Sequence, residues 1–327
     1  MKRGLMVAIA LLALCAWDVS VVCAAAGLER EFEKTVALRG GGSVQLKNVT
    51  GPATVTGWDR EEVQIRAVIT LDREPMDDEM RELFEKVEIV VEHSWNGVKI
   101  RTKYPDSDWD GDNHDVDGPE FDFDLHGEDS EHSAFAEGIL AMVGQVVGNV
   151  TGWVTGLVQD HLPVKVSYEV YVPRKCDLEV KTVTGDLLIT GVEGAIETSL
   201  VTGNTSLVDV IGGMDCGVVT GNIEIEGADG EIKTSVVTGN ASLSMKRDGD
   251  FKGIHCNVIN GDVLVRIPEM EAFDFDFYAV NGKISMDTEA IEGIRDGSSH
   301  IGSMNGGGPD LNIKAINGSI RLERAVR

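Results

Sequence analysis

Positive charge is scarce in this chain of 327 residues, which has 29 lysines and arginines against 55 aspartates and glutamates. The formal net charge is −26. Nucleic acids and anionic membrane surfaces are repelled by a field of this sign, whereas divalent cations are attracted. The composition therefore excludes nucleic acid as a partner.

Cysteine is also scarce, with five residues, two of which lie near the N-terminus. That terminus has the features of a secretory signal peptide over residues 1–26: Lys2 and Arg3, then an apolar stretch, then small residues. An N-terminal membrane anchor is the alternative. The three other cysteines form no disulfide framework, because their number is odd and they lie 40 residues apart: Cys176, Cys216 and Cys256. We expect an exported protein of the periplasm, cell envelope or medium, not transmembrane once the signal is removed.

Catalytic motifs are missing as well. The chain has no G-x-S-x-G, H-E-x-x-H, paired Cys-x-x-Cys or phosphate-binding loop. A hexapeptide-type acyltransferase or a polysaccharide-acting β-helix would need a histidine, or a cluster of basic and acidic residues, on one coil face. No histidine occurs between Val183 and Leu243. We predict a non-enzymatic protein, with such a β-helical enzyme as the alternative.

What the chain does contain is a repeat of Thr-Gly or Asn-Gly pairs. Their glycines follow one another at steps of 18, 18, 18, 22, 21 and 36 residues: Gly185, Gly203, Gly221, Gly239, Gly261, Gly282 and Gly318. The segments between them are short and rich in β-branched residues, which favours strands. A unit of about 20 residues cannot bury its apolar face alone and must stack on its neighbours. We therefore expect an all-β fold, with a single-stranded parallel β-helix (a β-solenoid) over residues 164–327.

The repeat makes two further predictions. Glycine supplies the positive φ of tight corners, and the last step of 36 residues leaves room for a skipped or degenerate unit. Residues four positions before each turn Thr or Asn should form one column: Val180, Thr198, Cys216, Thr234 and Cys256. Coils stack about 4.8 Å apart, which places Cys216 and Cys256 roughly 9–10 Å from each other. That separation is too great for a disulfide, so we expect free thiols. A left-handed prism of hexapeptides is the alternative, although steps of 22 and 21 do not fit it.

Two segments resemble one known family. They are "EFEKTVALRGGGSVQLKNVTGPATVTGWDREEVQIRAVIT" (Glu31–Thr70) and "VSYEVYVPRKCDLEVKTVTGDLLITGVEGAIETSLVTGN" (Val166–Asn204). In their order of motifs they are similar to the bacterial putative-adhesin domain family, whose biochemical function is unknown. The resemblance implies a right-handed β-helical fold, a cell-envelope setting and a binding role toward an envelope or surface ligand. It supplies no catalytic residues.

The family-like halves, 27–103 and 164–327, are separated by an insertion over 104–163. Its first part, 105–132, has twelve acidic residues and neither lysine nor arginine, which is typical of a flexible loop. Within it the spacing of a calcium-binding loop occurs, with aspartate at the final position: Asp106, Asp108, Asp110, Asp112 and Asp117. A solvated acidic linker and a calcium site are both compatible with this pattern.

The second part of the insertion, 138–158, is a run of 21 residues without charge. Glycine occurs at every fourth position, which would form one smooth stripe on a helix: Gly144, Gly148, Gly152 and Gly156. Such stripes allow close backbone packing between helices. The segment either packs on the flank or end of the solenoid, or meets a membrane interface or a second copy. A conventional helix is expected over 76–86, with Met80, Leu83, Phe84 and Val87 facing the sheet.

Overall fold

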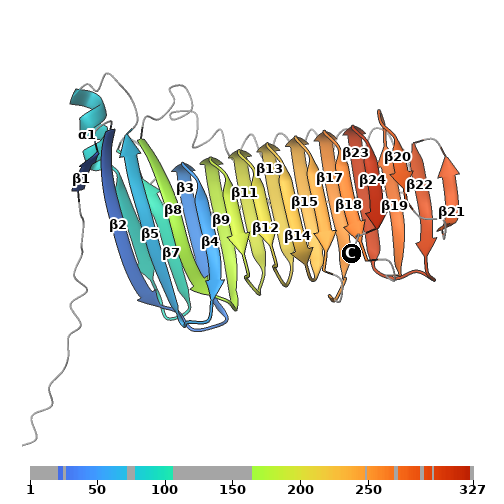
Figure 1. Ribbon diagram of the computed structural model, residues 1–327, viewed down its shortest axis with the longest axis horizontal. Helices are drawn as coiled ribbons and strands as arrows, with labels where there is room; N and C mark the ends of the chain where they lie inside the picture. The colour runs from blue at the N-terminus through green and yellow to red at the C-terminus, as the bar shows by residue number, and fades with distance from the viewer. Residues whose placement is uncertain are drawn as a thin grey trace, which may run out of the picture.

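The computed structural model describes residues 21–24, 27–71, 78–105, 164–246, 249–268, 272–287, 291–296 and 298–324. Within these ranges the protein is all-β, with two mixed sheets of 12 strands each and one helix (Figure 1). No helix in the described ranges has the length and apolar character needed to cross a bilayer.

Sheet A has the following strands in spatial order: β1 (Val21–Ala24), β2 (Gly27–Ala37), β5 (Glu62–Leu71), β8 (Val164–Pro173), β4 (Ala53–Trp58), β10 (Leu187–Thr190), β12 (Thr205–Val208), β14 (Ile223–Ala228), β16 (Ala241–Met245), β18 (Val263–Ile267), β24 (Ile320–Arg324) and β20 (Ile284–Met286). Sheet B has these: β21 (Ile291–Asp296), β22 (Ser299–Met304), β19 (Phe273–Ala279), β23 (Asp310–Asn317), β17 (Gly253–Asn260), β15 (Glu231–Thr238), β13 (Met214–Thr220), β11 (Ile196–Thr202), β9 (Cys176–Thr184), β3 (Gly42–Thr50), β7 (Gly97–Lys103) and β6 (Glu88–His93).

The central part of both sheets is built from rungs. We define a rung as a strand of sheet B, the glycine corner after it, and the strand of sheet A that follows, for example β11, Gly203 and β12. Rungs β9–β10, β11–β12, β13–β14, β15–β16 and β17–β18 lie side by side in parallel. The predicted column is confirmed, because Thr198 pairs with Val180 and Cys216, and Thr234 pairs with Cys216 and Cys256.

The seven predicted corner glycines are brought together in one column, which begins at Gly51. The Cβ of an alanine at Gly203 would lie 2.1 Å from the carbonyl oxygen of Gly185, and one at Gly221 would lie 1.9 Å from that of Gly203. Both residues also have positive φ, of 143° and 146°. Glycine is therefore required twice here, for its backbone conformation and for the close approach of the next rung.

The residue after each corner glycine forms a second ladder along the same edge. The side-chain oxygen of Asn204 accepts bonds from the backbone N–H and side-chain amide of Asn222, both at 3.0 Å. Asn222 in turn accepts from the N–H and amide of Asn240, at 2.8 and 3.2 Å. Each corner is thus tied to the next, which reinforces the parallel register.

The stacking order departs from chain order in two places. Rung β3–β4 pairs with β9–β10, although the insertion lies between them in the chain. Rung β23–β24 lies between β17–β18 and β19–β20. Gly282 therefore stacks on Gly318 and not on Gly261. The 36-residue step contains β20, the antiparallel hairpin β21–β22 and β23 instead of a degenerate unit, so a degenerate unit is the wrong explanation of this step.

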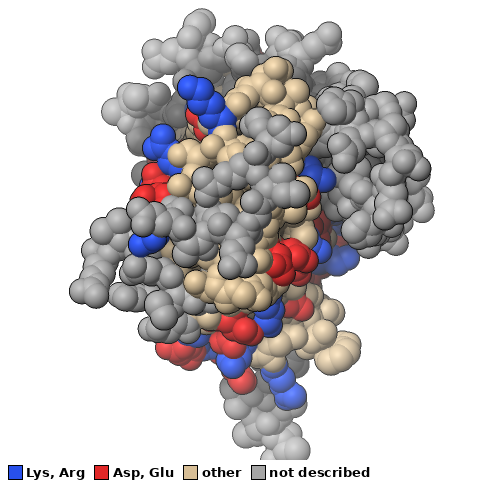
Figure 2. Space-filling model, turned by 90° about the vertical axis from the view of Figure 1, so that its right-hand side faces the viewer, with Lys and Arg blue, Asp and Glu red and all other residues tan. Residues whose placement is uncertain are grey.

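Both ends of the sheets are antiparallel, which corrects the expectation of purely parallel pairing over 164–327. At one end β1, β2, β5 and β8 pair antiparallel, as do β6 and β7. At the other, β19, β22 and β21 pair antiparallel. Sheet B continues there for two strands beyond sheet A. Seen from this end (Figure 2), uncharged side chains occupy much of the described surface, with charged ones around them.

The edge of sheet B at β6 is covered by sheet A and the helix. Arg30 of β2 donates to the carbonyl oxygens of Glu85 and Val87, and Lys34 Nζ lies 3.5 Å from that of Val91. Such basic side chains block an exposed edge against further pairing. The helix α1 (Asp78–Lys86) confirms the prediction, because Phe84 and the following Val87 are buried while Met80 and Leu83 pack against the core.

The core lies between the inner faces of the two sheets and is mainly aliphatic. The three cysteines there are free and buried, as predicted. Burial raises the pKa of Cys216 and of Cys256 to about 12. These thiols are space-filling groups and not nucleophiles, because the reactive thiolate is strongly disfavoured.

Three predicted features lie outside the described residues. They are residues 1–20 of the signal peptide, the calcium-loop aspartates of 106–117, and the glycine stripe within 138–158. The described strand β1 falls inside the predicted signal peptide, so cleavage after Ala24 or Ala26 would remove it.

Candidate functional site

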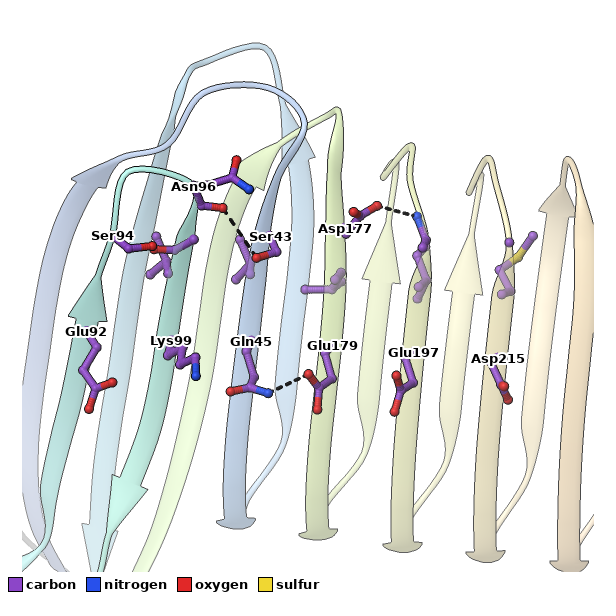
Figure 3. Close-up of a pocket in the computed structure, with 18 of the residues that line it drawn as sticks. Ser43, Gln45, Glu92, Ser94, Asn96, Lys99, Asp177, Glu179, Glu197 and Asp215 are labelled. Carbon is purple, nitrogen blue, oxygen red and sulfur yellow. Dashed lines mark hydrogen bonds between the residues drawn. The ribbon is translucent and has the colours of Figure 1, made fainter. Parts of the chain in front are cut away.

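A hollow of about 850 Å³ lies on the outer face of sheet B (Figure 3). It crosses β6, β7, β3, β9, β11 and β13 and reaches β15. Side chains alternate between the two faces of a strand, so the residues that follow the buried core positions point into this hollow. Its floor is therefore set by the same register that builds the core.

One row of polar side chains runs across the floor of the hollow. Register pairing places these residues next to one another on successive strands: Lys99, Gln45, Glu179, Glu197, Asp215 and Lys233. Gln45 Nε2 donates to Glu179 Oε2 at 2.6 Å. Lys181 Nζ lies 2.6 Å from Glu179 and 3.5 Å from Glu197. Three carboxylates thus lie on adjacent strands, about 4.8 Å apart.

The carboxylates in the row differ in their electrostatic environment. Burial and, after it, the neighbouring charge of Glu197 raise the pKa of Asp215 to about 6, against the opposing effect of Lys233. Burial also acts to raise the pKa of Glu179, but its contacts with Lys181 and Gln45 outweigh this and lower the pKa below its ordinary value. Asp215 is the carboxylate that would gain most from a cationic ligand, because such a ligand would stabilise its charged form.

The rim of the hollow is held by hydrogen bonds. Asp177 Oδ1 accepts from the N–H of Ala195 at 2.9 Å, and Ser94 Oγ donates to the carbonyl of Gly97 at 3.2 Å. Between the lining residues Ser94 and Asn96, Trp95 is 89% exposed. An exposed indole beside a polar hollow is a common anchor for ligands, because it offers a large apolar face at low entropic cost.

The lining of the hollow carries six carboxylates and two lysines: Glu92, Asp177, Glu179, Glu197, Asp215, Glu231, Lys99 and Lys233. In the part of the chain that the structure describes, no group of three or more His, Cys, Asp or Glu is arranged to hold a metal ion. His93 Nε2 lies 2.8 Å from the carbonyl oxygen of Ala37, so this nitrogen carries a proton and donates it to that oxygen. The geometry suits a ligand that brings cationic or hydrogen-bond-donating groups.

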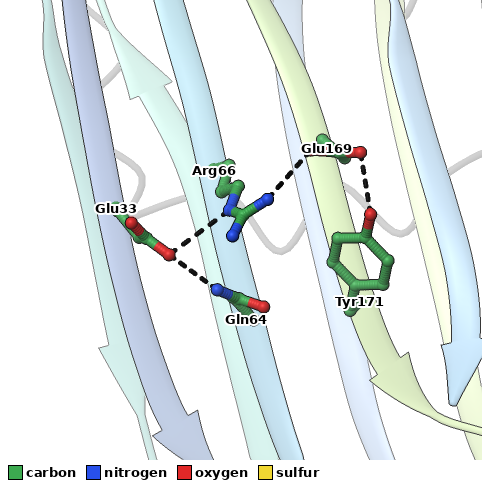
Figure 4. A network of polar contacts seen from close by, with 5 residues as sticks. All are labelled: Glu33, Gln64, Arg66, Glu169 and Tyr171. Carbon is green, nitrogen blue, oxygen red and sulfur yellow. Dashed lines mark hydrogen bonds and ion pairs between the residues drawn. The ribbon is translucent and has the colours of Figure 1, made fainter.

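A second polar cluster lies on the outer face of sheet A, on β2, β5 and β8 (Figure 4). Glu33 Oε1 accepts from Gln64 Nε2 at 2.6 Å and from Arg66 Nε at 3.3 Å. Arg66 also pairs with Glu169 at 3.8 Å, and Glu169 accepts from the hydroxyl of Tyr171 at 2.8 Å. These side chains form hydrogen bonds and an ion pair with one another across three antiparallel strands, and so stabilise the pairing of the strands. Because its polar groups already have partners, the cluster is a weaker candidate site than the hollow.

Sequence reasoning missed the hollow, although a signal for it exists. Glu179, Glu197 and Asp215 lie 18 residues apart, at the same position of three consecutive repeats, and Lys233 follows at the fourth. Trp95 carries no such periodic signal, because it belongs to the β6–β7 turn. Of the predicted site residues, the corner glycines are brought together, whereas the calcium-loop aspartates and the glycine stripe lie outside the described residues.

In sequence comparisons, no protein-family model and no curated protein matches this chain. Several solved structures are similar at low scores, including the following three. A "putative cell adhesion protein" from Clostridium sporogenes has a TM-score of 0.34 and 10% identity, over 90% of this chain and 100% of that one. A "putative adhesin" from Bacteroides fragilis has a TM-score of 0.34 and 13% identity, over 90% and 97%. A "putative lipid binding protein" from Parabacteroides distasonis has a TM-score of 0.31 and 10% identity, over 90% and 96%.

Proposed function

We propose that this protein is a non-enzymatic, adhesin-like β-solenoid that is exported and binds or scaffolds in the bacterial cell envelope. The parallel rungs with stacked glycine corners support the solenoid, and the sequence resemblance implies that it is right-handed. The signal-like N-terminus supports export to the periplasm, cell envelope or medium. The resemblance to the bacterial adhesin-like family supports the envelope setting.

The hollow on sheet B carries this proposal. It combines a volume of about 850 Å³, a row of carboxylates in fixed register and the exposed Trp95 at its rim. Sites of this size hold a ligand fragment or one segment of a polymer. Because carboxylates outnumber lysines in the lining, the ligand is an envelope or surface component that presents cationic groups. Calcium binding by the aspartates of 106–117 would be a separate, modulating event.

The test is calorimetric titration with spermine, a linear cation that can bridge carboxylates on neighbouring strands. The double variant Glu197→Gln/Asp215→Asn should weaken binding about tenfold or more, which corresponds to about 1.4 kcal/mol. The matched control is Glu224→Gln/Glu226→Gln on the outer face of sheet A, which has the same charge change but lies away from the hollow. Equal binding by the wild type and both variants would show that the hollow does not bind cations.

Pull-down of an envelope fraction then tests the biological ligand. Trp95→Ala should reduce the recovered material while leaving the unfolding curve unchanged, because the indole is exposed and contributes little to the core. Unchanged recovery by Trp95→Ala and by the double carboxylate variant together would place the binding surface elsewhere.

One observation favours an enzyme as the second candidate. Glu197 and Asp215 are neighbours on adjacent strands, and the raised pKa of Asp215, about 6, is suited to a general acid. A polysaccharide-acting enzyme would use such a pair. Release of reducing sugar from envelope glycans, abolished by Asp215→Asn, would support this candidate; intact glycans after prolonged incubation would leave the binding role.

A further inference from the structure

An uncharged strip runs along the outer face of sheet B beside the charged hollow. Its first column consists of small or amide side chains on β11, β13, β15 and β17, with Lys181 on β9 and Lys314 on β23 at its two ends: Ser199, Gly217, Ser235 and Asn257. Its second column is aliphatic on seven successive strands: Val49, Val183, Val201, Val219, Val237, Ile259 and Ile316. A chain in which 26% of residues are charged has no charge in this second column.

These aliphatic residues belong to the outer face by alternation. In β11, Ile196, Thr198 and Leu200 are buried in the core, and Val201 follows on the opposite face. The same alternation holds in β15, β17 and β23. The column therefore offers a continuous ridge of β-branched side chains on the outside of the molecule.

The strip is most buried at its first two aliphatic residues, whereas the other five are partly exposed. Val49 is only 3% exposed and Val183 only 4% exposed, although both follow core residues on the outer side of their strands. Gly217, which also lies on the outer face, is buried. Outer side chains in the hollow range from partly buried, such as Asp215, to exposed, such as Glu197.

The insertion leaves the described structure after β7, beside Val49 at one end of this strip, and rejoins it at the start of β8. Strand β7 runs parallel to β3, and Thr102 Oγ1 bonds to Asn48 Oδ1 at 3.0 Å, so the next residue, Lys103, lies beside Val49. Tyr104 donates its hydroxyl proton to the carbonyl of Val164 at 3.4 Å, which places the two ends of the insertion together. The chain between them therefore starts beside the first aliphatic residue of the column and ends on β8 of sheet A, in hydrogen-bond contact with Tyr104 at its start.

We propose that the uncharged segment 138–158 of this same chain docks along the aliphatic column of sheet B. Seven strands spaced about 4.8 Å apart give a column roughly 29 Å long. As a helix, 21 residues would span about 31 Å at 1.5 Å per residue, so segment and column match in length. The glycine stripe, Gly144 to Gly156, gives the segment a side without protruding side chains, against which a ridge of Val and Ile side chains fits closely.

This inference is independent of the proposed function, because it concerns the face beside the hollow and not the ligand in it. Its occupant is a segment of the chain itself, favoured over a membrane or a second copy by the tether at Lys103 and Val164 and by the burial of Val49 and Val183.

The test measures the accessibility of a cysteine placed in the column. Val219→Cys is labelled with a maleimide in the mature protein without residues 1–26, in which the three remaining cysteines are buried and unreactive. Labelling is then repeated in a chain whose residues 138–158 are replaced by a Gly-Ser linker of equal length. The rate at position 219 should rise roughly tenfold or more when the segment is replaced, because local protection is lost. The control, Ser242→Cys on the outer face of sheet A, should label equally in both chains.

A point variant covers the case in which the linker chain fails to fold. Gly148→Phe fills the stripe in the otherwise intact protein and should raise labelling at position 219 in the same way. Equal labelling of Val219→Cys in wild-type and Gly148→Phe backgrounds would overturn the proposal. Protection that appears only as protein concentration rises would assign the column to a second copy, and protection that appears only with phosphatidylglycerol vesicles would assign it to a membrane; either result also overturns it.

Discussion

The corner glycines support a quantitative prediction, because the chain provides a matched pair. Gly221 has φ of 146°, and an added Cβ would lie 1.9 Å from the carbonyl oxygen of Gly203 and 2.6 Å from its carbonyl carbon. Gly213, in the same repeat, has nothing within 4 Å of such a Cβ. The two alanine variants therefore add the same methyl group, at Gly221 against the backbone of the next rung and at Gly213 into open space.

The cost at Gly221 comes from three sources. Holding alanine at this φ costs on the order of 1–3 kcal/mol. Relief of the clash must separate two rungs that are joined by bonds such as Gly203 N–H to the carbonyl of Thr220, at 3.0 Å. Each such bond contributes about 0.5–1.5 kcal/mol, and residual overpacking costs about 1–3 kcal/mol. We expect Gly221→Ala to lower the free energy of unfolding by about 3–6 kcal/mol.

The same substitution at Gly213 should be neutral or stabilise by about 0.4–1 kcal/mol, because alanine has fewer unfolded conformations. Urea denaturation followed by far-UV circular dichroism measures both values, with the denaturant slope checked for each variant. The stacked-corner argument is refuted if the two alanine variants differ by less than about 1 kcal/mol.

Three further predictions concern other parts of the protein. Folding raises the pKa of Asp215 from 3.8 to about 6, so its protonated form stabilises the fold fully below pH 4, and this contribution is lost as pH rises through 6. Asp215→Asn should thus raise the free energy of unfolding by about 1–2 kcal/mol at pH 7.5 and by nearly nothing at pH 4 in urea titrations; an equal effect at both pH values would contradict this. Asn222→Ala removes the acceptor of two bonds from Asn240 and should cost about 1–2 kcal/mol, whereas Asn222→Asp, which keeps the acceptor, should cost less when measured in the same way. In calorimetric titrations, calcium should bind to the full chain with a Kd below the millimolar range, and Asp108→Ala should bind it more weakly. Identical heat changes in the wild type and in Asp108→Ala would show that the loop at 106–117 does not bind calcium.

Much of the fold could be predicted because the repeat is local. Alternation within each strand decides which side chains enter the core, and the step between glycines decides which residues become neighbours in space. The column through Cys216 and Cys256 followed from spacing alone, and so did the free thiols. The buried face of Phe273–Phe277 also follows from alternation.

The candidate site was harder to predict than the core. Its carboxylates recur every 18 residues, but their chemistry depends on how deeply each is buried, and burial is a property of the folded surface. The raised pKa of Asp215, to about 6, arises because the folded chain excludes water around it and places Glu197 alongside. Trp95 became a candidate only because the β6–β7 turn places it at the rim of the hollow.

The sequence by itself determined the type of strand, the glycine corners and the aliphatic interior, because each depends on short-range periodicity and on the conformational freedom of single residues. Only the tertiary structure decided the order of the last rungs. Rung β23–β24 lies between two rungs that precede it in the chain, and the antiparallel hairpin β21–β22 extends sheet B alone. The physical reason is that rungs of similar sequence offer similar unpaired strand edges. The pattern of residues within one rung therefore cannot specify which edge a strand from a distant part of the chain will pair with. That choice depends on loop connections and on packing over the whole core.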